Sequence, residues 1–190
     1  WLNAGAEQVI DAVTAAGNDV VWTLSGLGPA SFWGRRRAHE AAVHLADAQL
    51  AAGRDVDLAP DVAADGVDEW LTRIAASTAG TADSARTPAQ DLRGDGQSLH
   101  VHATDPGLSG TGEWLVTRTP SGVTVARGHG KADVAVRGPA VGLLLVLTRR
   151  AWLSFGIAFI AQGAVLVVSA IKMKNLGSPL LPADFRFVSA

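Results

Sequence analysis

The hydrophobic period of this chain changes near residue 97, and that change limits the folds that are open to it. Before this point the apolar residues recur at helical spacing, as they do in residues 2–16. After it they alternate with polar residues, as they do in SLHVHAT at residues 98–104. A helical part that is followed by a stranded part predicts an α+β protein.

The first part predicts three helices, at residues 2–16, at 29–53 and from Pro60 to residue 78. Proline suits the first turn of the second helix, where an N–H group has no partner to lose. Gly53 suits the position just after its end. Between the first two helices we expect a short apolar connection at residues 19–24 and then a turn.

The second part predicts a small antiparallel sheet with at least one helix. A helix is expected after Gly138-Pro139, and strands are expected at residues 98–104, 113–118, 123–127 and 131–137. Residues 79–96 are rich in Thr, Ala, Ser, Asp and Gly, which is typical of a linker or a mobile loop.

An uncharged apolar stretch, residues 151–171, follows the second part. About 21 residues at a rise of about 1.5 Å each cover about 31 Å, which is enough to cross the hydrocarbon of a bilayer. The stretch therefore predicts a transmembrane-type helix, with a buried core helix as the alternative. Residues 172–190 are short and rich in proline, so we expect a tail rather than a domain.

Composition excludes several function classes. The chain has no cysteine, so it has no disulfide, no thiolate nucleophile and no Cys-ligated zinc. Its net charge is −2 and Arg35-Arg36-Arg37 is its one basic run, which argues against nucleic-acid binding.

The lack of cysteine fits a cytoplasmic protein. We expect a cytoplasmic domain that is associated with a membrane through the single helix 151–171.

Glu40 and His44 are the first candidates for chemistry. They are four residues apart on the expected helix 29–53, so their side chains lie on one face. A carboxylate one turn before an imidazole, aimed at a neighbouring helix, forms half of a divalent-metal site. The alternative is an ion pair on the surface of an amphipathic helix.

His39 also precedes His44 in a pattern that resembles the zinc-protease motif H-E-x-x-H, but the spacing has one residue too many. Five residues turn by about 140° around a helix, so these two histidines cannot bind one ion together from this helix. We expect His39 to face elsewhere.

Four phrases in the chain are longer and more specific. They are WTL with FWGRRRAHEAAVHLADA, then LAPDVAADGVDEWL, GDGQSLHVHATD and GEWLVTRTPSGVTVARGHGKADVAVRGPA. Together they resemble the actinobacterial maleylpyruvate isomerase family, the mycothiol-dependent DinB-like proteins. The resemblance covers residues 1 to about 150. It implies a remnant of a DinB-like metal-binding helical bundle at residues 1–78, the linker 79–96, and a truncated C-terminal α/β domain at 97–150.

The resemblance also implies a cofactor. The family metal is typically zinc, held by a Glu and a His four residues apart and by a His from an earlier helix. Glu40 and His44 match the pair, and the helix that carries the other ligand would precede Trp1, so we expect a bundle that is truncated at its N-terminus. In the family the metal activates the sulfur of mycothiol as a thiolate. The thiolate adds to the cis double bond of maleylpyruvate, and rotation and elimination give the trans isomer.

The expected function is therefore that of a metal-binding, thiol-dependent cis–trans isomerase or thiol transferase with a small-molecule substrate. Mycothiol is the expected thiol cosubstrate, and zinc or another divalent ion is the expected metal. We assign no catalytic residue, substrate or oligomeric state, and activity is left open because one metal ligand is missing. The alternative is a non-catalytic, membrane-tethered metal-binding or interaction domain.

The end of the chain carries a second and shorter resemblance. KMKNLGSPLLPADF, with the apolar stretch before it, is similar to the segment where the transmembrane part of lipoteichoic-acid-synthase-type phosphoglycerol transferases ends. None of that family's catalytic domain is present. We therefore interpret residues 151–190 as a fragment that is fused to the rest.

Some side chains on the second helix have both a functional and a structural interpretation. Asp47, one turn after His44, could orient its ring or remain solvated. The run Arg35-Arg36-Arg37 could bind an anionic substrate or thiol. Pairing on the helix surface, including Arg36 with Glu40, is the alternative.

The histidines of the second part are also ambiguous. His100 and His102 share one sheet face and could be ligands, but no carboxylate is near them in sequence, which favours a solvated face. Gly128-His129-Gly130 is too short for a phosphate-binding loop and lacks a following helix.

Arginines and tryptophans complete the candidates. Arg118 and Arg137 could each supply a second-domain arginine near the site, and the sequence does not decide between them. The six tryptophans, including Trp22, Trp33 and Trp70, are expected to anchor the core.

Overall fold

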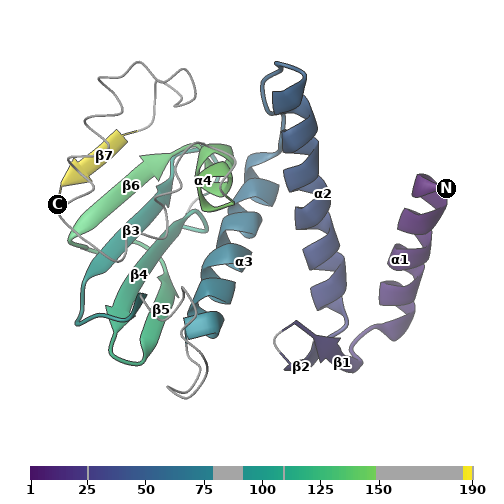
Figure 1. Cartoon of the computed structure of the whole chain (residues 1–190), viewed down its shortest axis with the longest axis horizontal. Coiled ribbons are helices and arrows are strands. Elements are labelled where there is room, and N and C mark those ends of the chain that lie inside the picture. The colour runs from purple at the N-terminus through teal and green to yellow at the C-terminus, as the bar shows by residue number, and fades with distance from the viewer. Residues whose placement is uncertain (25, 79–91, 109, 149–185, 190) are drawn as a thin grey trace. The chain divides into compact units, whose positions relative to one another are not determined.

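A computed structural model describes residues 1–24, 26–78, 92–108, 110–148 and 186–189. The chain forms two compact units, Trp1–Asp55 and Val56–Ala190. Within the described residues, the first unit contains two helices and a hairpin, and the second contains a sheet with two helices (Figure 1). The α+β class that the change of period predicts is therefore confirmed.

The first unit begins with α1 (Leu2–Ala16) and ends with α2 (Ser31–Ala51), and these two helices pack against each other. Between them β1 (Val20–Thr23) and β2 (Gly26–Pro29) form an antiparallel hairpin. Thr23 Oγ1 donates a hydrogen bond to the Gly26 carbonyl at 2.7 Å, which holds the turn closed. The sequence predicts only a connection and a turn here, because four-residue strands are too short to show alternation.

The start of α2 also differs from its prediction. Pro29 is the last residue of β2, and the helix begins at Ser31. The buried side chains of α2 are His39, Ala42, Val43 and Ala46. Their spacing of three and four residues defines one buried face of the helix.

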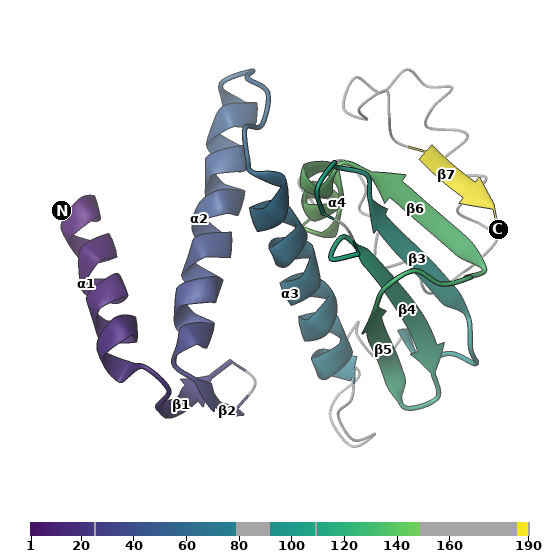
Figure 2. The same cartoon turned by 180° about the vertical axis from the view of Figure 1, so that it is seen from behind.

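The second unit contains a five-stranded sheet in the order β5-β4-β3-β6-β7. Its strands are β3 (Ser98–Ala103), β4 (Glu113–Thr119), β5 (Gly122–Arg127), β6 (Val134–Gly138) and β7 (Arg186–Ser189). The pairs β3–β4, β4–β5 and β6–β7 are antiparallel, whereas β3 and β6 are parallel. Figure 2 shows the same order from behind.

The predicted antiparallel sheet is therefore wrong in one respect, because the sheet is mixed. After β5 the chain returns along the sheet through residues 128–133, and Val134 of β6 lies opposite Leu99 near the beginning of β3. Alternating hydrophobicity indicates which face a side chain takes, but it does not identify the partner strand. The four predicted strands are found, although the last begins at Val134 and not at residue 131.

Two helices cover one face of this sheet. In this layer α3 (Pro60–Thr78) packs against β5, α4 (Ala140–Leu147) packs against β3 and β6, and the helices contact each other (Figures 1 and 2). Among the described residues of this unit, the largest side chains that are fully buried are Val67, Leu71, Trp114, Val116 and Leu144. The core of the second unit lies between these two layers.

Asp68 of α3 connects the helix to two strands. Trp114 Nε1 of β4 donates to Asp68 Oδ1 at 3.0 Å. Arg127 at the end of β5 donates to the same oxygen from Nε at 2.8 Å, and its Nη2 lies 2.7 Å from Oδ2. The buried indole N–H and the buried carboxylate therefore satisfy each other, as buried polar groups must.

The position of α3 differs from the predicted grouping. The helical period groups residues 60–78 with the earlier helices, but α3 packs on the sheet of the second unit. Its buried residues at helical spacing, Ala63, Val67 and Leu71, form the packing face. The other proposed boundaries stay predictions, and most of the linker 79–96 lies outside the described residues.

The transmembrane-type helix in the predicted fold class is contradicted. Among the described residues, no helix has both the length and the apolar surface that crossing a bilayer requires. The long helices α2 and α3 carry charged side chains, and the apolar α4 has only 8 residues, which is about 12 Å of helix. The stretch 151–171 itself lies outside the described residues. Of the predicted tail 172–190, residues 186–189 form the edge strand β7.

Candidate functional site

Three histidines and one glutamate gather on the sheet face opposite α3 and α4. Val101 is buried under the helices, so its neighbours His100 and His102 project from the other face of β3. Glu113, the first residue of β4, is the cross-strand partner of His102. The hairpin register therefore brings a carboxylate to two imidazoles that lack one nearby in sequence.

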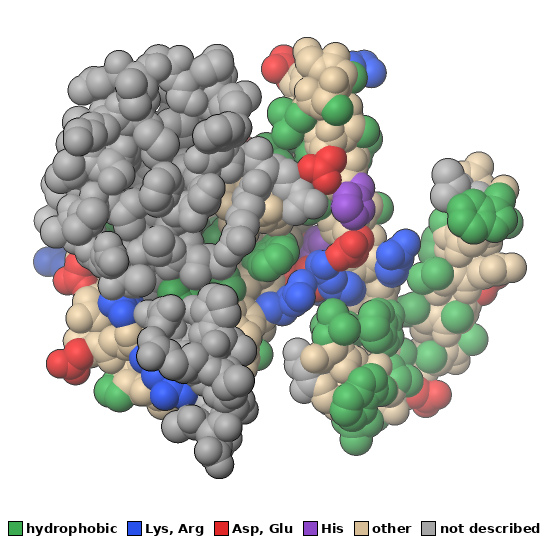
Figure 3. Space-filling view, in the orientation of Figure 1, with side chains coloured by type: hydrophobic (Ala, Val, Ile, Leu, Met, Phe, Trp, Pro, Cys, Tyr) green, Lys and Arg blue, Asp and Glu red, His purple; other side chains and the backbone are tan. Residues whose placement is uncertain are grey.

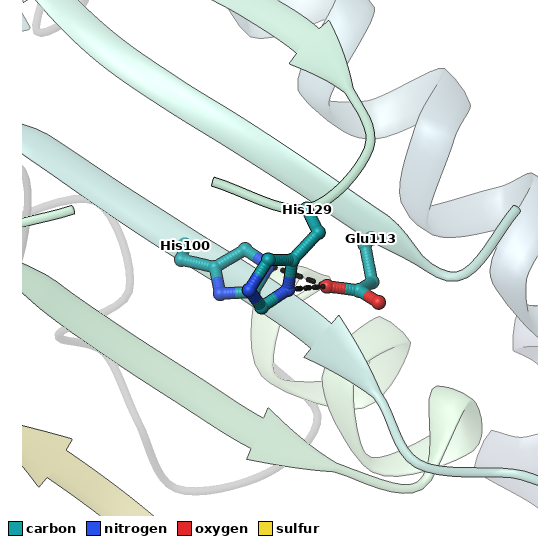
Figure 4. Close-up of side chains that lie close together, drawn as sticks. All are labelled: His100, Glu113 and His129. Atoms are coloured by element: carbon teal, nitrogen blue, oxygen red, sulfur yellow. Dashed lines mark hydrogen bonds and ion pairs between the residues drawn. The ribbon is translucent and has the colours of Figure 1, made fainter. Parts of the chain in front are cut away.

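One carboxylate oxygen is the centre of this cluster (Figure 4). Glu113 Oε2 lies 2.9 Å from His100 Nε2 and 2.8 Å from His129 Nδ1. His102 Nδ1 lies 3.9 Å from the same oxygen. The His100 side chain is 7% exposed and that of Glu113 is 18% exposed, whereas His129 is 78% exposed. The cluster therefore has a buried base and one side chain open to solvent.

The segment that crosses the sheet after β5 supplies His129. The Gly128 N–H donates to the Glu113 carbonyl at 2.9 Å, which fixes the start of the segment above β4. Gly128 has a φ of 114°, a conformation that side-chain-bearing residues rarely adopt. The glycine therefore lets the chain turn so that His129 lies on Glu113.

The electrostatics favour a charged carboxylate beside a neutral imidazole. Burial raises the pKa of Glu113, but hydrogen bonds from His129 and His100 and the attraction of His102 outweigh it, so the pKa lies below its ordinary value. Burial lowers the pKa of His102, Glu113 opposes this, and Arg137 and the other histidines add to the lowering. His102 is therefore neutral at pH 7.

A cavity of about 210 Å³ adjoins the cluster. Its lining residues are His102, Ala103, Thr104, Asp105, Leu108, Gly110, Gly112, Glu113 and Arg137. Asp105 Oδ2 accepts a hydrogen bond from the Ala140 N–H at 2.6 Å, which ties it to the start of α4. The cavity thus has a mixed-charge wall that includes the central carboxylate of the cluster.

The predicted pair Glu40 and His44 lies on one face of α2, as its spacing requires. His44 Nε2 is 3.7 Å from Glu40 Oε2, and Arg36 pairs with the other oxygen of that carboxylate. On its other side His44 Nδ1 is 3.1 Å from Asp47 Oδ2, so the predicted orienting contact is present. With its proton on Nδ1, the ring presents the Nε2 lone pair to Glu40.

The direction of this pair differs from the prediction of an interior site. The His44 side chain is 65% exposed and the Glu40 side chain is 33% exposed. His39, which we expected to face elsewhere, is on the buried face of α2 at 3% exposure. Figure 3 shows histidine, acidic and basic side chains close together on the surface of α2. Whether Glu40 and His44 bind a metal stays a prediction.

The two candidate arginines of the second unit have different surroundings. Arg118 donates from Nε to the Leu92 carbonyl at 3.1 Å and from Nη2 to the Arg93 carbonyl, so it fastens the segment before β3. Arg137 lines the cavity beside Glu113. Of the two, only Arg137 is near the cluster.

The predicted role of the tryptophans is correct for Trp114 and wrong for Trp22. Trp114 is fully buried, whereas Trp22, on the two-stranded hairpin, is 73% exposed. The solvated-face interpretation of the histidines is also wrong for His100, which is 6% exposed. The alternation of β3 predicts that His100 and His102 share one face, but Glu113 and His129 come from other elements.

The fold and the cluster define a class: an α+β domain with a mixed sheet, two helices on one face of it and a His/Glu group of metal-binding type on the other face. Residues 61–154 match the family model of the MDMPI C-terminal domain, and this match fits the maleylpyruvate isomerase family, which is a metal-binding family. The matched segment includes all four residues of the cluster and begins at the second residue of α3. No curated protein matches the chain.

Proposed function

We propose that this chain is a divalent-metal-binding protein of the mycothiol-dependent maleylpyruvate isomerase type, with Glu40 and His44 as metal ligands. The match of residues 61–154 supports the family. The observation that carries the proposal is the 3.7 Å between His44 Nε2 and Glu40 Oε2, with Asp47 behind the ring. A carboxylate that fixes the tautomer of a metal-binding histidine is a common feature of zinc sites.

The donor set fits zinc. Two ligands of a tetrahedral zinc with bonds of about 2.0 Å lie about 3.3 Å apart, so a shift of a few tenths of an ångström would suffice. Arg36 occupies one oxygen of Glu40 and leaves the other facing His44. Imidazole nitrogen and carboxylate oxygen are both zinc donors. When bound, the metal would lower the pKa of a thiol enough to hold it as thiolate near pH 7.

The proposed substrates are a low-molecular-weight thiol, mycothiol, and a small molecule with an activated double bond. In an isomerase the sulfur adds to the cis double bond, the new single bond rotates, and the same sulfur leaves to give the trans isomer. The thiol is therefore not consumed. In a transferase the thiol remains attached to the product. The exposure of His44 leaves the pair open to both molecules.

Two ligands from one helix predict weak metal binding. We expect zinc to bind the full chain at this site, and Glu40→Gln and His44→Ala to abolish that binding, because either change removes a donor. Glu7→Gln on α1 is the matched control, since it removes an exposed carboxylate elsewhere in the same unit. Zinc titration by calorimetry measures the effect, and unchanged binding in both variants would reject the proposal.

The catalytic part needs a separate assay. Zinc-loaded chain with mycothiol and maleylpyruvate is expected to form fumarylpyruvate, without net loss of free thiol if it is an isomerase. Stoichiometric loss of free thiol would indicate a transferase. Absence of both products, with zinc bound at the pair, would reject the enzymatic function and leave a metal-binding domain.

A further inference from the structure

The cluster on the sheet face opposite α3 and α4 is not used by the proposed function, because the pair on α2 belongs to the first unit and the cluster belongs to the second. We propose that His100, Glu113 and His129 form a second zinc site, independent of Glu40 and His44. The three side chains come from β3, from β4 and from the segment that crosses the sheet after β5. Distant parts of the sequence thus place three zinc-type donors at one point.

The geometry is close to that of a bound ion. The three ligand atoms all lie within 4.8 Å of one another. Ligands of tetrahedral zinc are about 3.3 Å apart, so the 2.8 and 2.9 Å contacts to Glu113 Oε2 would lengthen by about 0.5 Å. His129 is 78% exposed between two glycines, so its own contact can lengthen by movement of its side chain. The contact of the buried His100 lengthens by a small rotation of the Glu113 carboxylate, and β3 and β4 stay in place.

The chemistry of the donors also fits. A carboxylate that carries its charge accepts hydrogen bonds only, so both imidazoles donate N–H groups to Glu113 Oε2 in the absence of metal. An ion at this point would meet two nitrogens and one carboxylate oxygen, after each ring moves its remaining proton to its other nitrogen. Protonated histidine cannot bind, so zinc affinity is expected to fall with acidification.

The surroundings of the three side chains favour a metal-binding site over a simple His–Glu ion pair. Holding Glu113 in the sheet requires only one buried partner, and His100 supplies it at 7% exposure. The exposed His129 adds a second imidazole to the same oxygen and leaves that side open for an ion to enter. The cavity of about 210 Å³ is lined by Glu113, so it offers room beside that carboxylate for the water that a three-ligand zinc site holds in its fourth position.

The test uses the full chain, stripped of metal and titrated with zinc against a chromophoric chelator. His129→Ala is the informative variant, because its exposed side chain can be removed without opening the core. Lys131→Ala in the same crossing segment is the matched control. Removing groups that merely orient zinc ligands costs about 10–100-fold in affinity, so loss of a ligand is expected to cost at least about 100-fold. The control is expected to stay within about threefold of wild type.

Variants of the first unit separate the two proposals. His44→Ala is expected to lose only the weaker site and to keep the site that His129→Ala abolishes. Wild-type zinc affinity in His129→Ala would overturn the second site and leave the pair on α2 untouched. Zinc binding that is lost in His129→Ala but unchanged in His44→Ala would overturn the pair on α2 and leave the site on the sheet untouched. A chain that binds no zinc would overturn both.

A second measurement does not depend on affinity. Imidazole nitrogen NMR spectra of the full chain are expected to show zinc-induced shifts of His100 and His129, assigned with the single variants. The buried His39 serves as the internal reference and should not shift. Zinc that shifts His44 alone would contradict the site on the sheet.

Discussion

His100 Nε2 and Glu113 Oε2 lie 2.9 Å apart although 13 positions separate the two residues in the chain. The antiparallel register of β3 and β4 causes this approach, since it pairs His102 with Glu113 and sets His100 diagonally beside them. Because His100 is held in a central strand, the position of Glu113 is fixed by the fold rather than by a flexible loop. The following predictions depend on these contacts and on the packing behind them.

Acid should weaken the second unit through Glu113. The pKa of this carboxyl is lower in the folded protein than its ordinary value. The charged carboxylate therefore stabilises the fold fully at a pH above its pKa in the unfolded chain, and this contribution is lost as the pH falls through its pKa in the folded protein. We expect the free energy of unfolding to decrease more steeply in wild type than in Glu113→Gln over this acidic range. Urea unfolding between about pH 3 and pH 6, with a chelator present, measures the difference. Parallel curves for the two proteins would contradict the prediction.

His102 should add a pH dependence at less acidic values. Its pKa is lowered from 6.5 in the folded protein, mainly by burial, so the unfolded chain takes up this proton first as the pH falls. The contribution of His102 to the free energy of unfolding is therefore full at a pH above its pKa in the unfolded chain. It is lost as the pH falls through its pKa in the folded protein. We expect His102→Gln to flatten the stability curve just below about pH 6.5. A variant with the slope of wild type would show that His102 does not titrate differently on folding.

Asp68 should be important for the attachment of α3 to the sheet. Asp68→Ala leaves the fully buried Trp114 N–H without its acceptor and removes the partner of Arg127. An unsatisfied buried donor costs about 1–3 kcal/mol, and we expect a loss of that size in urea unfolding. Asp68→Asn retains an acceptor oxygen and should lose less. Equal losses in both variants would show that the charge pair matters more than the indole hydrogen bond.

Gly122 should not tolerate a side chain. Its φ of 143° is unfavourable for other residues, and a Cβ there would lie 2.7 Å from Thr78 Oγ1 and 2.8 Å from the Thr78 carbonyl oxygen. We expect Gly122→Ala to destabilise the protein by about 1–3 kcal/mol, because both backbone strain and a steric clash oppose it. Gly130→Ala is the comparison, since the nearest atom to its Cβ would be 3.4 Å away. Similar melting temperatures for the two variants would contradict this account of the contact between α3 and β5.

The elements that the sequence predicts well are those with a clear period. The helix that begins at Pro60 and the strand of His100 are found where their patterns place them. The hairpin β1–β2 is not predicted, because its strands of four residues are too short to show a period and the large apolar side chain of Trp22 is exposed. The parallel pairing of β3 with β6 was missed as well, since it depends on the return of the chain through residues 128–133.

The candidate sites divide in the same way. Glu40 and His44 are linked by the spacing of one helix, so the sequence predicts their proximity, although the exposure of His44 depends on packing. Glu113 joins His100 through strand register and His129 joins it through a chain crossing, and the position of His129 has no signature in the linear sequence. A strand with two histidines on one face, followed by a carboxylate at the start of the next strand, is the signal that could have been used.

Anomalous diffraction at the zinc absorption edge locates bound zinc, so it decides whether this chain binds divalent metal through histidine and carboxylate side chains. Crystals of the full chain grown with zinc are predicted to show a peak about 2.0–2.2 Å from His100 Nε2, His129 Nδ1 and Glu113 Oε2. A second, weaker peak is predicted between Glu40 and His44. Crystals that contain zinc but show no anomalous peak at either place would contradict the account.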